Sequence, residues 1–201
     1  MEDSHDLVVV GAGPSGSCAA IAGAQRGVKT LLIDKRDEIG DNNHCGELLP
    51  TPREVSDLLP RAADVERLFT VPPKIVRTRT KVLRLVSPSG RSSEFPFESN
   101  IIDRRAFEKH LAIEASRHGA DVMPSTRATG LLHDKQGIQA SRRGEKIEIR
   151  CEVIIGCDGV GSRVAKWSGL SDRMSPNDSI VGVQYEMSRI QIEKDVVEMY
   201  F

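Results

Sequence analysis

Three residues with reactive side chains stand close together in the segment HCGELLP, His44 to Pro50. His44, Cys45 and Glu47 could bind a metal, supply a thiol nucleophile, or form a loop shaped by a bound cofactor. A zinc site is disfavoured because His44 and Cys45 are adjacent and no second ligand pair follows at the spacing of a zinc finger or ribbon. The chemistry of this segment therefore depends on what the rest of the chain binds.

A glycine pattern near the N-terminus predicts a dinucleotide-binding site. The apolar run Leu7 to Val10 is typical of a buried parallel strand, and G-x-G-x-x-G follows it directly. Gly11 allows the tight turn, Gly13 lets the backbone approach a pyrophosphate, and Gly16 lets the next helix pack closely. That helix is rich in alanine, ends near Gly27, and directs its unpaired N–H groups at the phosphates.

An acidic residue at the end of the second strand completes this pattern. The strand Lys29 to Ile33 delivers Asp34 about 20 residues beyond the glycines, where a carboxylate can accept hydrogen bonds from a ribose. The acid favours a free 2′-hydroxyl, as in FAD or NAD, over the 2′-phosphate of NADP, although Lys35 and Arg36 weaken this distinction. The alternative is a glycine-rich turn that binds nothing, and the four features in register argue against it.

The segments after Asp34 do not continue the alternation of an NAD-type Rossmann domain. A polar loop, 37–52, comes first. Residues 74–97 then predict two extended segments around the turn SPSG, with Pro96 confining the second to a sheet edge. Residues 101–119 predict a helix capped by Asp103.

The next part of the chain predicts a strand and a β-meander, followed by another buried strand, Glu152 to Gly156. This strand leads to Asp158 and Gly159, and a helix begins near Ser162. Such a position suits a carboxylate and a close backbone approach to a ligand. An ordinary Asp-Gly turn before a helix is the alternative interpretation.

Charge and composition exclude several classes of protein. Lys and Arg number 28 against 29 Asp and Glu, so no bulk field favours nucleic acid or an anionic membrane. The acidic N-terminus is unlike a secretory signal, and no apolar run reaches transmembrane length. The 4 cysteines have no CxxC spacing, which favours free thiols in a cytosolic protein. We therefore expect a cytoplasmic protein without a nucleic-acid partner.

Three stretches together resemble a known superfamily. The GxGxxG turn with Asp34, the DRRAF helix and GCDGVGSRVAKWSGL are similar to FAD-dependent oxidoreductases of the glutathione-reductase and p-hydroxybenzoate-hydroxylase type. Within it, DKRDEIGDNNHCGELLP most resembles the geranylgeranyl reductase family, whose flavoproteins saturate isoprenoid double bonds, notably in archaeal membrane lipids. The resemblance covers nearly the whole chain.

The resemblance implies an α/β fold, with a Rossmann-like FAD-binding domain, a β-meander and the start of an antiparallel-sheet substrate domain. We expect the FAD-binding domain at 1–175, with inserted strands at about 71–100, and the first strands of the substrate domain at 176–201. Those strands are SIVGVQYEMSRI and DVVEMYF. The superfamily's further C-terminal glycine-aspartate motif does not occur before Phe201, so we expect the N-terminal portion of a longer enzyme.

The resemblance also implies roles for single residues. Ser15 and Gly16 would approach the pyrophosphate, Asp34 would hold the adenosine ribose, and Cys45 with Gly46 would lie beside the flavin. The full set of implied cofactor contacts is Gly11, Gly13, Ser15, Gly16, Asp34, Lys35, Cys45, Gly46, Leu48, Arg104, Ala128, Asp158 and Gly159.

Three of these residues have plainer alternatives. Arg104 stands in the family's R-x-x-F pattern with Phe107, but could be a solvated cation at a helix end. Ala128, implied to hold the adenine through its backbone, could be a packing residue. Cys45 could be a small buried hydrophobic residue.

The implied reaction is hydride transfer from non-covalent, reduced FAD to an alkene of a prenyl lipid or another small molecule. Cys45 and Glu47 are the candidate catalytic residues, as proton donor or orienting group. The reductant would be external, such as NAD(P)H or ferredoxin, so an electron-donor protein is a potential partner, and peripheral membrane contact is compatible with the substrate.

One departure keeps other functions open. Leu48 stands where the family usually has a small residue, and GELLP has some likeness to the loop of flavin-dependent halogenases. The alternatives are a flavin-dependent monooxygenase or halogenase, in which oxygen takes the place of the alkene, and a non-catalytic or electron-carrying flavoprotein.

Overall fold

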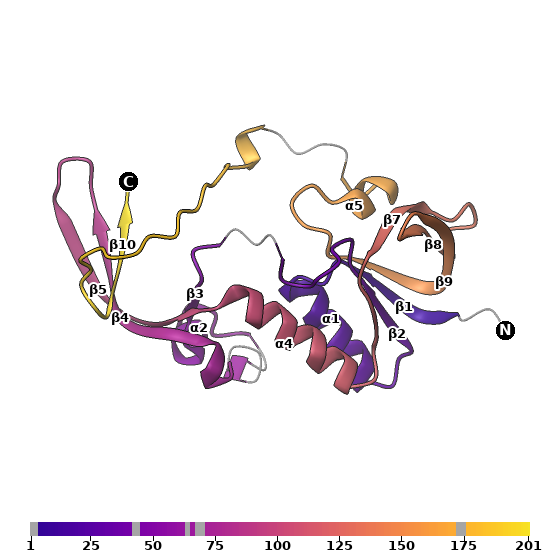
Figure 1. Cartoon of the computed structure of the whole chain (residues 1–201), viewed down its shortest axis with the longest axis horizontal. Helices are drawn as coiled ribbons and strands as arrows, with labels where there is room; N and C mark the ends of the chain where they lie inside the picture. The colour runs from indigo at the N-terminus through magenta and orange to yellow at the C-terminus, as the bar shows by residue number, and fades with distance from the viewer. Residues whose placement is uncertain (1–3, 42–44, 63–64, 67–70, 172–175) are drawn as a thin grey trace. The chain divides into compact units, whose positions relative to one another are not determined.

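The structure, a computed structural model, describes residues 4–41, 45–62, 65–66, 71–171 and 176–201 (Figure 1). The chain divides into two compact units. Unit 1 comprises Met1–Asn43 and Glu108–Val181, and unit 2 comprises His44–Phe107 and Gly182–Phe201. Each unit is described by itself below.

Unit 1 is built on a mixed sheet whose strand order is β6-β2-β1-β9-β8-β7. Strands β6, β2, β1 and β9 run parallel to one another, whereas β8 pairs antiparallel with both β9 and β7. This combination is the Rossmann-like sheet with a β-meander that the sequence predicts. The strands are β1 (His5–Val10), β2 (Thr30–Ile33), β6 (Asp121–Met123), β7 (Thr126–Leu131), β8 (Gly137–Arg142) and β9 (Glu145–Gly156).

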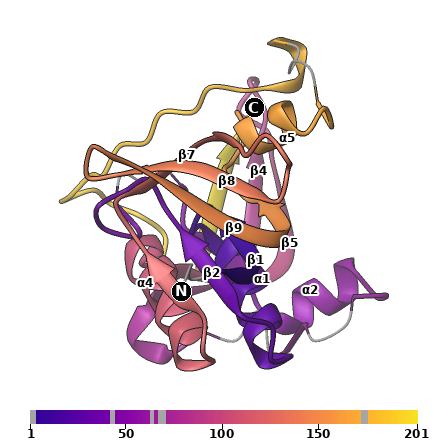
Figure 2. The same ribbon diagram turned by 90° about the vertical axis from the view of Figure 1, so that its right-hand side faces the viewer.

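The central strands are buried on both faces, as their continuous apolar runs predict. Because strand side chains alternate, Leu7 and Val9 of β1 pack with helix α1 (Pro14–Gln25) on one face, and Val8 and Val10 pack on the other. Helix α1 lies along β1 and β2 in both views (Figures 1 and 2). The core thus fixes the strand ends at which the glycine turn and Asp34 stand.

Two more α-helices contribute to unit 1 among its described residues. Helix α4 (Arg104–Arg117) begins after Asp103, whose Oδ1 accepts the Ala106 N–H at 2.9 Å, and the boundary between the units falls within it. Short helix α5 (Arg163–Trp167) follows Ser162, as predicted. A 3-10 turn, η2 (Pro176–Asp178), lies near the end of the unit.

The meander differs from the prediction at its last strand. The third meander strand and the strand predicted at 152–156 are one element, β9. The predicted burial of 152–156 is wrong, since Val153 is 53% exposed. The reason lies in the pairing: β8 ends at Gly137 opposite Arg150, so beyond that point the described residues place only β1 beside β9.

Unit 2 contains a smaller sheet with the strand order β10-β4-β5-β3. The predicted extended segments form the hairpin of β4 and β5, and Pro96 pairs with Val82. Among the described residues, β3 pairs only with Ser99–Ile101 of β5, so β5 has an open edge at Pro96, as predicted. The elements are β3 (Leu48–Pro50), α2 (Pro52–Leu58), η1 (Pro73–Ile75), β4 (Val76–Val86), β5 (Ser92–Ile102) and β10 (Val196–Tyr200).

Two expectations for this unit need correction. The segment 37–52, predicted as a loop, contains β3, because Leu48 to Pro50 find partners on β5. Of the two predicted C-terminal strands, only β10 forms, and it pairs in parallel with β4. The alternating residues 179–190 have no neighbouring strand within the described chain and form none.

Among the described residues, no helix is both long enough and apolar enough to cross a bilayer.

Candidate functional site

The glycine turn between β1 and α1 is closed so tightly that two of its glycines have no room for a side chain. Gly11 has φ +104, and a Cβ there would lie 2.3 Å from the Cys157 carbonyl oxygen. A Cβ on Gly16 would lie 1.8 Å from the Gly11 carbonyl oxygen. By contrast, a Cβ on Gly13 would meet no described atom within 4 Å. Two glycines therefore serve the fold, and Gly13 faces open space, as the predicted approach of a pyrophosphate requires.

The N-terminus of α1 is open to an anion. Gly13 is the N-cap, Pro14 begins the helix, and no side chain of the described residues caps it. The first turn carries no acidic residue, and Ser15 is exposed. Unpaired N–H groups and the positive end of the helix dipole are what a phosphate binds.

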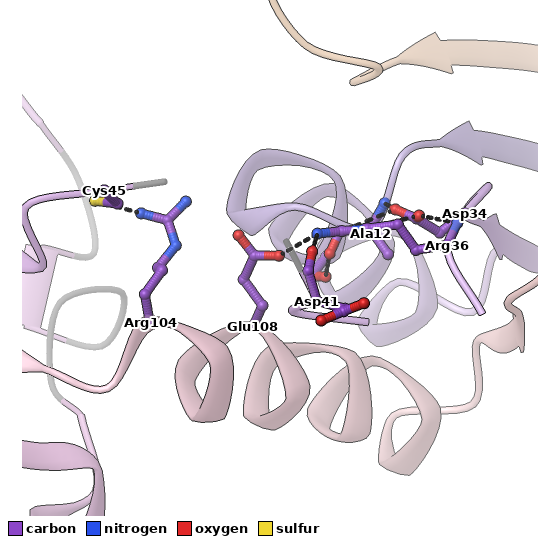
Figure 3. Close-up of polar contacts among 8 residues, drawn as sticks. Ala12, Asp34, Arg36, Asp41, Cys45, Arg104 and Glu108 are labelled. Atoms are coloured by element: carbon purple, nitrogen blue, oxygen red, sulfur yellow. Dashed lines mark hydrogen bonds and ion pairs between the residues drawn. The ribbon is translucent and has the colours of Figure 1, made fainter. Parts of the chain in front are cut away.

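Asp34 joins the end of β2 to the glycine turn. Its Oδ2 accepts the Ala12 N–H at 2.7 Å, and its Oδ1 accepts the Arg36 N–H at 2.8 Å and Nε at 2.9 Å (Figure 3). Burial alone raises the pKa of Asp34, but hydrogen bonds from the Arg36 side chain, the Arg36 N–H and the Ala12 N–H outweigh it, so the pKa lies below its ordinary value. The neighbouring Lys35 is exposed.

Asp158 and Gly159 form the turn between β9 and α5, next to the glycine turn. Cys157 donates its N–H to the Val10 carbonyl at 2.8 Å, and Gly11 packs against this same segment. Gly159 has φ +91. Two motifs that are about 150 residues apart in the sequence thus meet within unit 1, as expected when neighbouring parallel strands end at one edge.

The Asp158 carboxylate caps α5. It accepts the Ser162 hydroxyl, the Arg163 N–H at 2.6 Å and the Val164 N–H at 3.2 Å. Burial alone raises the pKa of Asp158, but the hydrogen bonds from Ser162, Val164 and Arg163 outweigh it and lower the pKa.

We expect Asp158→Ala to lower the free energy of unfolding by about 1 to 2 kcal/mol at neutral pH, because three donors lose their acceptor. The folded-state pKa is depressed, so this contribution is present above about pH 4 and is lost as the pH falls through the folded-state pKa. Urea unfolding of both proteins from pH 7 to pH 3 measures the difference, which should shrink on acidification. A neutral-pH difference below that of the control Glu152→Gln would contradict the cap.

Ala128 lies on β7, the edge strand of the sheet, in an interrupted part of the strand pairing. It is 9% exposed, packs in the apolar cluster with Val8 and Ile33, and pairs with Ala140 before a register shift. The side chain of Ala128 is therefore a packing residue, as the alternative interpretation of this position predicted. Its backbone is on the outer strand of the sheet, which is compatible with the implied contact to an adenine.

In unit 2, the structure brings Cys45, Glu47 and Arg104 together. Arg104 Nη1 donates to Cys45 Sγ at 3.5 Å, and the Arg104 N–H donates to Glu47 Oε1 at 3.3 Å. The Glu47 N–H in turn donates to Cys45 Sγ at 3.4 Å. A carboxylate at the first N–H of α4 is favourable both as a cap and in the helix dipole. Figure 3 shows the thiol and the guanidinium facing each other.

The backbone of this loop has an unusual conformation. Glu47 has φ +61, and its carbonyl accepts the Ile102 N–H at 3.0 Å, just before Leu48 enters β3. Gly46 is exposed and its Cβ position meets no described atom within 4 Å. His44 lies outside the described residues. Within the described parts of the chain, no group of three His, Cys, Asp or Glu residues could hold a metal ion.

Sequence reasoning missed the part that Arg36 and Glu108 play. Arg36 Nη1 donates to Glu108 Oε2 at 3.0 Å, and Glu108 is only 2% exposed. A signal was present in the sequence: Glu108 begins the stripe completed by Leu111, Ala112 and Ala115, all buried. A charged residue in an otherwise apolar helix stripe indicates a buried partner.

The geometry of unit 1 fits the adenosine and pyrophosphate of a dinucleotide. The tight glycine turn, the open space at Gly13, the uncapped α1 N-terminus and the buried carboxylate of Asp34 occur in the arrangement that such a cofactor requires. All four cysteines are free, so Cys45 retains its thiol.

Comparisons with known proteins agree with this geometry. The digeranylgeranylglycerophospholipid reductase of Methanothrix thermoacetophila is 36% identical over 97% of this chain and 49% of its own length. A geranylgeranyl bacteriochlorophyll reductase-like protein from Thermoplasma acidophilum matches all of this chain and 51% of its own, with 27% identity and a TM-score of 0.81. The flavin-dependent brominase Bmp2, with 19% identity and a TM-score of 0.63 over 82% of this chain and 40% of its own, shares the fold.

The chain spans about half the length of the curated relatives it matches. A family model for the FAD dependent oxidoreductases matches residues 6–192. The glycine turn, Asp34 and the Asp-Gly turn all lie inside this match, and the cofactor they fit is FAD. The chain belongs to the FAD dependent oxidoreductase family.

Proposed function

We propose that the full-length protein is a geranylgeranyl reductase-type enzyme that reduces isoprenoid double bonds of a prenyl lipid. The observation that carries this proposal is the 36% identity to a digeranylgeranylglycerophospholipid reductase along 97% of the chain. The Thermoplasma structure supports it, because its similarity also extends over the entire chain, into unit 2 as well as unit 1.

Reduced FAD, when bound, supplies the hydride for such a reaction. The residues of unit 1 serve to hold the cofactor: α1 takes the pyrophosphate at its N-terminus, Asp34 takes the ribose, and the edge strand β7 offers the Ala128 backbone to the adenine. Because the turn has glycine at positions 11, 13 and 16, no side chain at these positions stands between its backbone and the pyrophosphate.

We assign the chemical step to the Cys45 loop. Two donors, Arg104 Nη1 and the Glu47 N–H, fix the position of Cys45 Sγ. The thiol is then the proton source for the alkene carbon that does not receive the hydride, and the proton leaves from Sγ. Glu47 is an orienting group, since its carboxylate binds the first N–H of α4 and thereby ties the loop to the helix that carries Arg104.

The same proposal includes a division into domains. The FAD-binding domain spans 1–175 with inserted strands at about 71–100, and 176–201 begins the substrate domain. Support comes from the sheet of unit 1, to which segments on both sides of the insertion contribute strands.

Partners and location follow from the substrate class. A prenyl lipid resides in a membrane, so a cytoplasmic enzyme would meet it by peripheral contact at the membrane surface. The enzyme also requires an external reductant, NAD(P)H or a ferredoxin-type donor protein, to return FAD to its reduced state after each turnover.

Product analysis tests this function. The full-length protein is incubated with a geranylgeranyl glycerophospholipid and a chemical reductant under nitrogen, and the lipid is examined by mass spectrometry. We expect a product that gains two hydrogen atoms for each double bond reduced. A lipid that gains oxygen in an aerobic arm, or halogen when halide is supplied, and is never saturated, would contradict the proposal in favour of a monooxygenase or halogenase.

Cys45→Ala should leave FAD bound but slow the alkene-dependent oxidation of reduced enzyme by about a hundredfold or more, because a positioned proton donor contributes that much. The pyrophosphate and ribose contacts belong to other residues, so FAD affinity should stay within about twofold of the wild type. The rate is measured by anaerobic stopped-flow, with Cys18→Ala as control. A Cys45→Ala rate equal to that of the wild type would remove the thiol from the mechanism.

A further inference from the structure

The acceptor positions of Asp34 are already filled. Within the described chain, its Oδ1 accepts the Arg36 N–H and Nε, and its Oδ2 accepts the Ala12 N–H and Arg36 Nη2. An ionised carboxylate offers about four lone-pair positions, so each is occupied. A ribose hydroxyl can therefore bind Asp34 only by replacing one of these donors.

The four donors are not equally replaceable. The Ala12 N–H belongs to the glycine turn, where Ala12 packs in the core, and the Arg36 N–H belongs to the segment after β2, where the Arg36 carbonyl accepts the Ser125 N–H at 2.9 Å. The other two donors belong to the Arg36 guanidinium, whose side chain is 20% exposed. The guanidinium is therefore the group that a ribose hydroxyl displaces.

A second carboxylate, that of Glu108, can bind the displaced guanidinium. Glu108 Oε2 already accepts Arg36 Nη1 at 3.0 Å, and α4 brings this carboxylate to the same segment that carries Asp34 (Figure 3). Lys109 of α4 also forms an ion pair with Glu38, and Arg36 Nη1 lies 3.5 Å from the Asp41 carbonyl oxygen. Two ion pairs thus hold the 36–41 segment against α4, all within unit 1.

We infer that Glu108 is a positioning residue of the adenosine site. When a ribose hydroxyl takes the place of an Arg36 guanidinium N–H as a donor to the Asp34 carboxylate, Glu108 keeps the guanidinium in position. The inference rests on the proposed ribose contact of Asp34. Without Glu108, the displaced guanidinium would lose its carboxylate partner in a partly buried place, which is costly. With Glu108, the positive charge stays paired in both the free and the FAD-bound protein.

The inference predicts that Glu108→Gln weakens FAD binding only when Arg36 is present. In the full-length protein, stripped of FAD, Glu108→Gln keeps the shape of the side chain but removes its charge, and the dissociation constant for FAD should rise about tenfold. Adding Arg36→Met removes the guanidinium that competes for Asp34, so the double variant should bind FAD at least as tightly as the wild type. Flavin-fluorescence quenching gives the affinities, and thermal unfolding confirms that each variant is folded.

The control is Glu114→Gln, also on α4, where Glu114 pairs with the exposed Arg117; its FAD affinity should equal that of the wild type. An unchanged affinity in Glu108→Gln overturns the inference. A double variant that binds FAD tenfold more weakly than the wild type also overturns it. This arm applies even if the single variant does not fold, because the double variant leaves no buried guanidinium without a carboxylate, and Asp34 keeps the N–H groups of Ala12 and of residue 36 as donors. If Asp34→Ala keeps full affinity, the ribose assignment itself fails; if only Asp34→Ala weakens binding, the ribose assignment stands and the role of Glu108 falls.

Discussion

Replacing Gly16 by alanine should abolish FAD binding by the full-length protein and lower its free energy of unfolding by about 3 kcal/mol or more. The new Cβ would lie 1.8 Å from the Gly11 carbonyl oxygen and 3.0 Å from its carbon. These are backbone atoms of the turn itself, so α1 must move away from β1 to relieve the overlap. Urea unfolding and FAD titration of the same preparation measure the two losses.

Gly13→Ala is the matched control within the same turn. Gly13 has φ −72, and its Cβ would meet no described atom within 4 Å, so alanine fits without strain. Its stability should stay within about 0.5 kcal/mol of the wild type. Its FAD affinity should nevertheless fall, because the methyl group occupies the space through which the pyrophosphate approaches the backbone. A Gly16→Ala protein as stable as Gly13→Ala would contradict the packing argument, and full FAD affinity in Gly13→Ala would contradict the assigned path of the pyrophosphate.

Asp34→Ala should weaken FAD binding by about ten- to a hundredfold, which corresponds to the loss of about 1.5 to 3 kcal/mol from a charge-assisted hydrogen bond. The carboxylate is 6% exposed, and its hydrogen bond from the Ala12 N–H holds it at the glycine turn. Equilibrium titration with FAD measures the effect. Asp37→Ala removes an exposed carboxylate of the same segment and should bind FAD normally. Equal affinities for the two variants would mean that Asp34 does not contact the ribose.

The glycine turn and Asp34 could be predicted from the sequence because their geometry is local. Gly11 and Asp34 belong to one strand, helix and strand unit, in which each glycine has a steric purpose that spacing alone reveals. The structure confirms the local packing at Gly11 and Gly16. Asp158 was found for the same reason, since it directly follows a strand and precedes a helix.

The sequence identified Cys45 and Glu47 as candidate site residues, but it could not predict their contacts with Arg104. Cys45 and Arg104 are separated by 59 residues, and their contact depends on the pairing of β3 with β5 and on the start of α4. No residue pattern specifies that register. The family resemblance implied that each of them contacts the cofactor, whereas only the structure shows the hydrogen bonds that fix Sγ.

The sequence did not predict the ion pair of Glu108 or the extent and burial of β9, because both depend on tertiary contacts. Helical periodicity predicts a buried face for residue 108, but only the structure supplies the guanidinium that neutralises a carboxylate there. The apolar residues 153–155 suggested that 152–156 form a separate buried strand, while β8 ends opposite Arg150 and, among the described residues, leaves their outer side unpaired. The resemblance likewise implied a strand at 179–190, which requires a partner that the described chain does not place beside it.

Anaerobic stopped-flow of the photoreduced, full-length protein against a geranylgeranyl glycerophospholipid tests the central claim most directly. The oxidised-flavin absorbance should return at a rate that depends on lipid concentration, in the absence of oxygen, and a fully saturated lipid should leave the flavin reduced. If the flavin stays reduced with the unsaturated lipid and is oxidised only when oxygen is admitted, the protein is not a reductase of isoprenoid double bonds.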